Sequence, residues 1–176
     1  MTTTPTGRIE QRDGQHVLVQ TREFRAPIED VWAAVTEPDR LARWIGSWTG
    51  DPAAGSVEFR MLFEGEDHAA ETMTIRVCEP PHRLHLTSHA GEDTWLIELD
   101  LTHADGITTV TFAQPGVTAE QVGAVGPGWD YYLDRLVDVE TGADPALRDF
   151  ERDYYPATSE HYTAQLGQPG QLGQPG

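Results

Sequence analysis

The sequence predicts an α+β fold in which helices cover one face of an antiparallel sheet. From residue 56 to residue 112, apolar and polar residues alternate with the period of two that is typical of half-buried strands. From residue 122 to residue 137, apolar residues recur instead at helical spacing. Turn-forming residues such as Gly65, Pro80-Pro81 and Gly91 separate the alternating segments at hairpin distances. A run of hairpins followed by a helix indicates a sheet with a single covered face.

The first elements are a strand and two short helices. The strand follows the Asp13-Gly14 turn and continues to about residue 24. Pro27 starts the first helix, at a position where its missing N–H costs nothing. The second helix carries Trp44 and ends at Gly46. Helices this short are marginal in water, so they must pack against the rest of the chain.

The middle of the chain supplies the sheet, with one apolar face on each strand. Because side chains alternate between the two faces, these apolar residues are expected to share the covered face. They are Val57, Phe59, Met61 and Phe63; Met73, Ile75 and Val77; Leu84 and Leu86; Trp95, Ile97, Leu99 and Leu101; and Val110 and Phe112.

The covering helix contains Trp129, Tyr132 and Leu133 in its apolar stripe. Thr118 and Gln121 are placed to cap its first turn. The "GPG" of residues 126–128 either kinks this helix or separates a short turn from a helix that starts near residue 127.

Three regions follow from this organisation. Residues 8–142 form the domain. Residues 143–164 form a C-terminal extension in which Phe150, Tyr154, Tyr155 and Tyr162 are anchors, either onto the domain or onto a second copy of the chain in a homodimer. Residues 165–176 repeat one hexapeptide with too little apolar content to fold, and are expected to be a flexible tail.

Three segments resemble the START-like, helix-grip (SRPBCC) superfamily, in particular its branch of homologues of the activator of the heat-shock-protein-ninety ATPase. They are "REFRAPIEDVWAAVTEPDRLARW" at 22–44, "EPPHRL" at 79–84 and "GWDYYLDRLVD" at 128–138. The resemblance spans residues 10–142 and does not include the last 34 residues. It implies a curved antiparallel sheet of about six or seven strands wrapped around a long C-terminal helix, with a cavity between them.

The resemblance also implies which residues surround that cavity. They are the inward-facing residues of the sheet and helix, and we expect them to bind a small apolar or amphipathic molecule. The alternative is that they simply fill the core. The residues are Trp44, Trp48, Phe59, Met61, Phe63, Glu71, Met73, Ile75, Leu86, Trp95, Ile97, Trp129, Tyr132 and Leu133.

Polar candidates for catalysis are few. Glu71 has the same parity as Met73, so it points inward at the edge of the cavity, unless the start of its strand frays into water. With Tyr132 and His68 it would supply the acid and base of an enzyme. His85 and His89 lie on the polar side of their strand and do not converge, so no metal site is expected. No cofactor motif is present.

Charge and cysteine content limit the partners. A formal net charge of −17 disfavours nucleic acid and anionic membrane surfaces as partners. The single cysteine, Cys78, cannot form an intrachain disulfide and is expected to be a small buried hydrophobe. Without a signal-peptide pattern or a membrane-spanning apolar run, the cytoplasm is the expected compartment.

Three functions remain open at this stage. The first is a non-catalytic protein that binds a small hydrophobic molecule. The second is an enzyme of the polyketide cyclase or dehydratase kind, which some helix-grip relatives resemble. The third is a co-chaperone-like module of the stress response that binds and regulates an ATPase, as the name of the resembling branch suggests.

Overall fold

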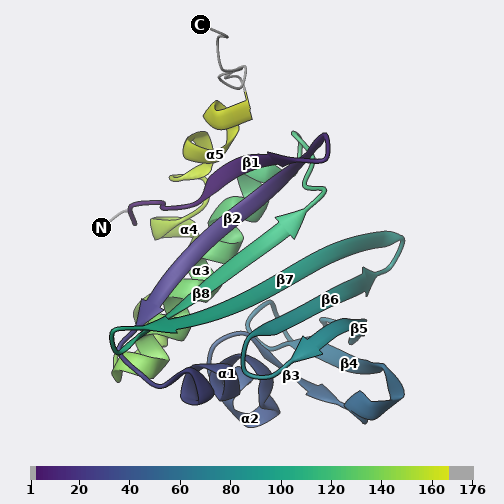
Figure 1. Cartoon of the computed structure of the whole chain (residues 1–176). Coiled ribbons are helices and arrows are strands. Elements are labelled where there is room, and N and C mark those ends of the chain that lie inside the picture. Colours follow the sequence, from purple (N-terminus) through teal and green to yellow (C-terminus); the bar gives the residue numbers. More distant parts are fainter. Residues whose placement is uncertain (1–2, 167–176) are drawn as a thin grey trace, which may run out of the picture.

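Eight antiparallel strands form one sheet that curves around a long helix (Figure 1). The structure is a computed structural model, and it describes residues 3–166. The order of the strands in the sheet is β1-β2-β8-β7-β6-β5-β4-β3. The strands are β1 (Arg8–Arg12), β2 (Gln15–Phe24), β3 (Gly46–Thr49), β4 (Ser56–Met61), β5 (Glu71–Glu79), β6 (Arg83–Ala90), β7 (Asp93–Ala104) and β8 (Ile107–Pro115).

The helices lie at the ends and on the covered face of this sheet. α3 runs behind β2 and β8 in Figure 1, whereas α1 and α2 lie at one end of the molecule. The helices are α1 (Ile28–Thr36), α2 (Pro38–Leu41), α3 (Val122–Thr141), α4 (Phe150–Asp153) and α5 (Ser159–Leu166), with short 3₁₀ turns η1 (Pro52–Ala54) and η2 (Pro145–Leu147). The predicted helix-grip α+β fold is confirmed, with eight strands where about six or seven were expected.

One additional strand is β1, which pairs with β2 in a hairpin. Its turn is Asp13-Gly14, where both residues have positive φ (51° and 79°) as a tight two-residue hairpin requires. Only Ile9 of β1 is apolar and partly buried. The strand therefore carries almost no alternating signal, and its place in the sheet comes from backbone pairing.

The other additional strand is β3, which corrects the prediction for the second short helix. α2 ends at Leu41, and Trp44 lies in the following turn instead of on a helix. Gly46 does not end a helix but begins β3, where it pairs with Met61. A side chain at Gly46 would lie 2.3 Å from the carbonyl oxygen of Arg60, so only glycine permits this pairing.

A β-bulge in β5 changes which residues face inward. Ile75 pairs with Leu86, but the next pair is Val77 with His85, so Arg76 is an extra residue. The bulge reverses the alternation beyond Ile75. The prediction that Val77 shares the face of Met73 was therefore wrong, and Cys78 takes the inward direction instead.

The long helix α3 is continuous through "GPG", with Pro127 inside it. Thr118 and Gln121 cap its start reciprocally, because the N–H of Gln121 donates to Thr118 Oγ1 and the N–H of Thr118 donates to Gln121 Oε1. A side chain at Gly126 would lie 2.5 Å from the ring of Tyr162. The small residues of this segment therefore let α5 pack closely on α3.

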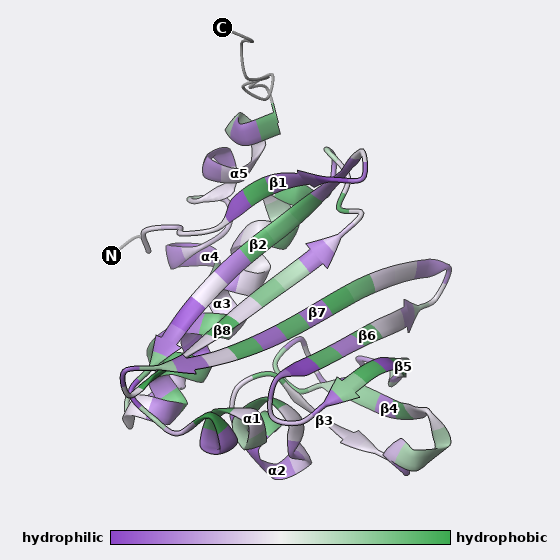
Figure 2. Cartoon of the chain, in the orientation of Figure 1, coloured by the Kyte–Doolittle hydropathy of each residue, from purple (hydrophilic) through white to green (hydrophobic). Residues whose placement is uncertain are grey.

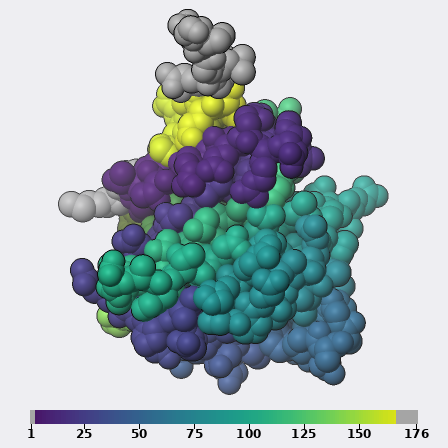
Figure 3. Space-filling view, viewed as in Figure 1, coloured from purple at the N-terminus to yellow at the C-terminus, as the bar shows by residue number. Residues whose placement is uncertain are grey.

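The C-terminal extension packs on the domain of its own chain. Tyr154 and Tyr162 are fully buried, whereas Tyr155 is 41% exposed. In the space-filling view, the yellow end of the chain lies beside the purple N-terminal strand (Figure 3). A hydrogen bond between these two segments agrees with this view, since the backbone N–H of Ile9 in β1 donates to the side-chain Oε1 of Gln165 in α5 at 2.8 Å. α5 continues to Leu166, and the rest of the predicted tail, 167–176, lies outside the described residues.

The hydropathy of the strands follows the alternation seen in the sequence, most clearly along β7 (Figure 2). The core lies between the sheet and α3, where Leu101 and Val110 pack with Leu136 and, further along, Leu18 and Phe112 pack with Leu133. Among residues 3–166, every helix is too short or too polar to cross a lipid bilayer.

Candidate ligand-binding pocket

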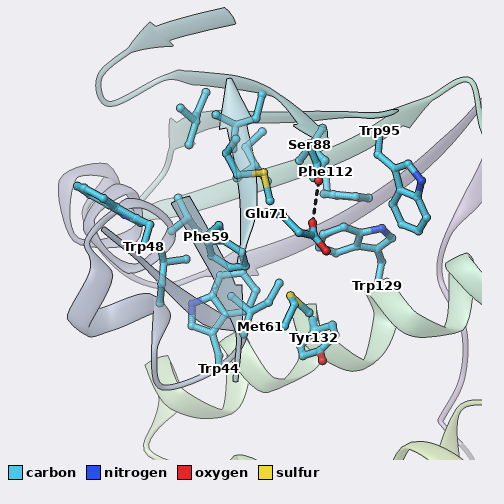
Figure 4. Close-up of a pocket in the computed structure, with 18 of the residues that line it drawn as sticks. Trp44, Trp48, Phe59, Met61, Glu71, Ser88, Trp95, Phe112, Trp129 and Tyr132 are labelled. Carbon is cyan, nitrogen blue, oxygen red and sulfur yellow. Dashed lines mark hydrogen bonds between the residues drawn. The ribbon is translucent and has the colours of Figure 1, made fainter. Parts of the chain in front are cut away.

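An apolar pocket of about 830 Å³ lies between the curved sheet and α3 (Figure 4). Strands β4 to β7 supply its wall on the sheet side, and α3 supplies the opposite side. The turn after α2 and strand β3 close one end with Trp44 and Trp48. The pocket is thus the space that remains where the curved sheet and α3 do not meet.

All the residues predicted to surround a cavity lie on the wall of this pocket. For those in β4 to β7 the inward direction follows from strand parity, which the sequence displays, and for those in α3 it follows from the helical stripe. They are Trp44, Trp48, Phe59, Met61, Phe63, Glu71, Met73, Ile75, Leu86, Trp95, Ile97, Trp129, Tyr132 and Leu133.

The pocket gathers every tryptophan of the chain, because Trp32 also lines it beside the four named above. Three indole N–H groups are bound by protein oxygens. Trp44 Nε1 donates to the carbonyl of Ala34 at 3.0 Å, Trp48 Nε1 to that of Thr36 at 2.8 Å, and Trp129 Nε1 to Gln114 Oε1 at 2.8 Å. These bonds hold the rings in place and leave their apolar surfaces for the pocket.

Glu71 forms one cluster of polar side chains on the pocket wall. Glu71 pairs with Phe59 in the sheet, so its strand does not fray there, and its side chain is only 23% exposed. Glu71 Oε2 accepts a hydrogen bond from Ser88 Oγ at 2.9 Å, and Figure 4 shows the carboxylate extending into the pocket. His68 Nε2 lies 3.6 Å from Glu71 Oε1.

A second polar group lies on the α3 side. Tyr132 donates its phenolic O–H to Glu64 Oε1 at 2.8 Å. Burial, reinforced by the charge of Glu64, raises the pKa of Tyr132 well above its ordinary value. The hydroxyl therefore stays protonated at neutral pH and is a hydrogen-bond donor there, not a base.

Sequence reasoning missed some residues of the wall and misplaced another. Ser88 has the same parity as Leu86 in β6, so the signal was present. Phe150 and Glu64 come from the extension and from a loop, where no periodicity shows direction. Cys78 was expected to be buried but is exposed near the end of β5, where it lines the pocket.

A separate cluster lies outside the pocket. Ligand atoms of His85, Glu98 and Asp100 lie within 4.8 Å of one another, which a metal ion would require. However, Arg12 binds Glu98 at 2.9 Å and Arg83 lies 3.6 Å from Asp100. The carboxylates thus already have cationic partners, and the arrangement is that of a surface ion-pair network between strands.

The family comparison matches this architecture. The sequence profile of the family described as "Activator of Hsp90 ATPase homolog 1-like protein" matches residues 25–140, which is more than half of the 176 residues. The chain belongs to this family. Its fold is that of the helix-grip (SRPBCC) superfamily. A search of curated proteins finds no match.

Solved structures resemble this family member along most of its length. The crystal structure of CalU16 from Micromonospora echinospora has a TM-score of 0.71 and 23% identity, covering 96% of this chain and 100% of that one. A protein from Bordetella parapertussis has a TM-score of 0.68 and 23% identity, covering 94% and 93%. At these identities the likeness concerns the fold alone.

DynU16, described as a protein in the dynemicin biosynthetic locus, is also similar. It has a TM-score of 0.62 and 26% identity, and the match covers 73% of this chain but only 49% of that one. The chain therefore corresponds to about half of DynU16.

Proposed function

We propose that this protein binds a small lipophilic molecule in the pocket between the sheet and α3, without converting it. The observation that carries this proposal is the pocket of about 830 Å³ that is lined by all five tryptophans. Pockets for drug-sized ligands typically enclose about 300–1,000 Å³ and are mostly apolar with few polar groups.

The size of the space argues against an ordinary core. Protein interiors are close-packed, and few of their voids exceed the size of a water molecule. Aromatic and methionine side chains such as Phe59, Trp129, Met61 and Met73 line a space many times larger. Large side chains that surround a space without filling it are better explained by an occupant than by packing with one another.

The neighbours support the same proposal. DynU16 is described as a protein in the dynemicin biosynthetic locus. We extend this by analogy to a product of biosynthesis as the ligand of this chain, and a void of about 830 Å³ accommodates a multi-ring apolar one.

A variant that fills the pocket tests the proposal. Gly128 lies on the wall, and a Cβ there would meet nothing within 4 Å. The probe is dehydroabietinol, a tricyclic neutral alcohol, followed by tryptophan fluorescence and by thermal unfolding. The wild-type protein should bind, and at 100 times Kd its unfolding free energy should rise by about 2.7 kcal/mol.

Gly128→Phe should abolish binding because its ring occupies the same space, while the matched control Gly128→Ala should bind like the wild type. Native mass spectrometry of protein purified from its own host should also retain a small molecule. If dehydroabietinol, and the related amine and acid, leave both fluorescence and unfolding unchanged in the wild type, the receptor function is ruled out.

A second candidate function is a cyclase- or dehydratase-type enzyme. The observation that favours it is the group of Glu71, Ser88 and His68 on the pocket wall, where a carboxylate and an imidazole lie 3.6 Å apart. These are acid and base groups within reach of a bound molecule. Conversion of a polyketide-like substrate that is lost in Glu71→Gln, with binding retained, would establish this function in place of simple binding.

A further inference from the structure

The charged groups that line the pocket are acidic. Glu71 and Glu64 contribute carboxylates to its wall, and His68 contributes an imidazole. The sequence has no lysine, and of the residues that the structure describes no arginine lines the pocket. Arg135, the single arginine of α3, does not itself line the pocket but contacts two residues of its wall, since its guanidinium lies over the ring of Phe63 and donates to the carbonyl of Trp44.

Glu71 has an oxygen that is available to a ligand. Its Oε2 is bound by Ser88 at 2.9 Å, but its Oε1 has only His68 Nε2 nearby, at 3.6 Å, which is beyond hydrogen-bond distance. The Glu71 side chain is 23% exposed, so this oxygen can be reached by a ligand in the pocket. A charged donor on the ligand would form a stronger hydrogen bond to it than a neutral donor would.

The tryptophans provide a second attraction for positive charge. The negative face of an indole ring attracts a cation that lies within about 6 Å of the ring centroid. In Figure 4, Trp95 and Trp129 lie on the side of the pocket into which Glu71 extends. A cation held by Glu71 would therefore have indole rings around it and apolar walls beyond it.

We infer that the pocket selects lipophilic amines, with the protonated nitrogen bound to Glu71 and the apolar skeleton among the tryptophans. This inference rests on the proposed binding function and adds the chemical class of the ligand. The formal charge of −17 also attracts cations to the whole molecule. The experiment must therefore distinguish binding of the amine by Glu71 from this general electrostatic attraction.

Three probes with one skeleton make that separation. Dehydroabietylamine is cationic at neutral pH, dehydroabietinol is neutral and dehydroabietic acid is anionic. Affinities are measured by calorimetry and by tryptophan fluorescence, at low and at moderate salt. The amine should bind at least about tenfold more tightly than the alcohol, and the acid most weakly.

Two variants identify the group responsible. Glu71→Gln keeps an acceptor for Ser88 and should remove the preference for the amine, so that the amine and the alcohol bind with similar affinity. Glu23→Gln removes one exposed charge that does not line the pocket, and should leave the preference for the amine intact.

The outcomes distinguish this inference from the proposed function. Binding of the alcohol or the acid as tightly as the amine would overturn the amine preference and leave the receptor function standing. A preference for the amine that survives in Glu71→Gln would overturn the role of Glu71. Absence of binding by all three probes would overturn the receptor function itself.

Discussion

Tyr162 shows how one residue connects three separate parts of the chain. Its side chain is fully buried, its O–H donates to Asp130 on α3, and it accepts a hydrogen bond from Gln20 Nε2 on β2 at 2.9 Å. Burial raises the pKa of Asp130, while the hydrogen bonds from Tyr162 and Arg22 oppose that rise. Tyr162 is therefore a principal partner of a buried acid.

Removing that hydroxyl gives the first prediction. Tyr162→Phe should lower the free energy of unfolding by about 2 kcal/mol, because Asp130 loses a donor and Gln20 loses an acceptor in a buried site. Denaturant unfolding measures the change. Tyr155→Phe is the matched control, because Tyr155 is 41% exposed and should be neutral. Equal stability of the two variants would show that the buried network contributes little.

At the scale of elements, glycine positions in α3 serve two different surfaces. Gly126 faces α5, where a Cβ would lie 2.5 Å from the ring of Tyr162. Gly128, two positions later on the same helix, faces the open pocket. The "GPG" segment thus serves close helix packing on one side and the pocket on the other.

Substituting alanine at these two positions is predicted to change the free energy of unfolding in opposite directions. Gly126→Ala should destabilise the protein by about 1–3 kcal/mol, because the ring of Tyr162 must shift in a packed interface. Gly128→Ala should stabilise it by about 0.5–1 kcal/mol, because alanine is the better helix former and meets no neighbour. Thermal and denaturant unfolding of both variants test this. A loss of stability in both would indicate that the two positions share the same constraint.

The strands differ in whether the sequence predicts which of their side chains face the pocket. Parity along β4, β6 and β7 correctly placed Phe59, Leu86 and Ile97 on the pocket wall. Parity failed in β5 beyond Ile75, because the extra residue at Arg76 reverses the alternation. A bulge depends on how two strands pair, and a single strand's sequence does not display it.

At the scale of the whole molecule, the C-terminal extension completes the fold. Arg22 on β2 binds Asp130 and Asp134 of α3, each at 2.9 Å. Tyr154 of the extension donates to Asp134 at 2.8 Å and accepts from Arg148 at 2.7 Å. Charges that would be costly to bury alone are thus paired between sheet, helix and extension.

This network predicts how stability depends on alkaline pH. Burial raises the pKa of Tyr154 to about 12 from its ordinary 10.0, and it raises the pKa values of Tyr132 and Tyr162 as well. The folded chain therefore holds these phenolic protons more tightly than the unfolded chain does. Their contribution is fully present below pH 10 and is lost as the pH rises towards 12.

Chemical denaturation at a series of alkaline pH values measures this loss, and ultraviolet absorbance follows the ionisation of the tyrosines. Tyr154→Phe should show a shallower decline than the wild type, while Tyr155→Phe should follow the wild type. A wild-type stability that stays constant up to pH 12 would contradict the assignment of buried, protonated tyrosines.

The sequence by itself determined the class of fold and the residues that face its interior. Apolar residues that alternate with a period of two, or recur at helical spacing, indicate which side of a strand or helix is removed from water. Asp-Gly and Pro-Pro pairs indicate where the chain turns. Those are local properties, so Phe59, Trp95 and Tyr132 could be assigned to one surface without coordinates.

Only the tertiary structure decided whether that surface is filled. The sequence pattern of apolar side chains in the sheet and in α3 is the same whether these side chains meet or leave a space between them. The distance between the sheet and α3 depends instead on the curvature of the sheet and on the elements that pack against the helix. The pairing of β1 with β2 and of β3 with β4, the bulge at Arg76 and the packing of Tyr162 against α3 are all part of this arrangement. Each is a contact between different elements, which the pattern within one element does not show.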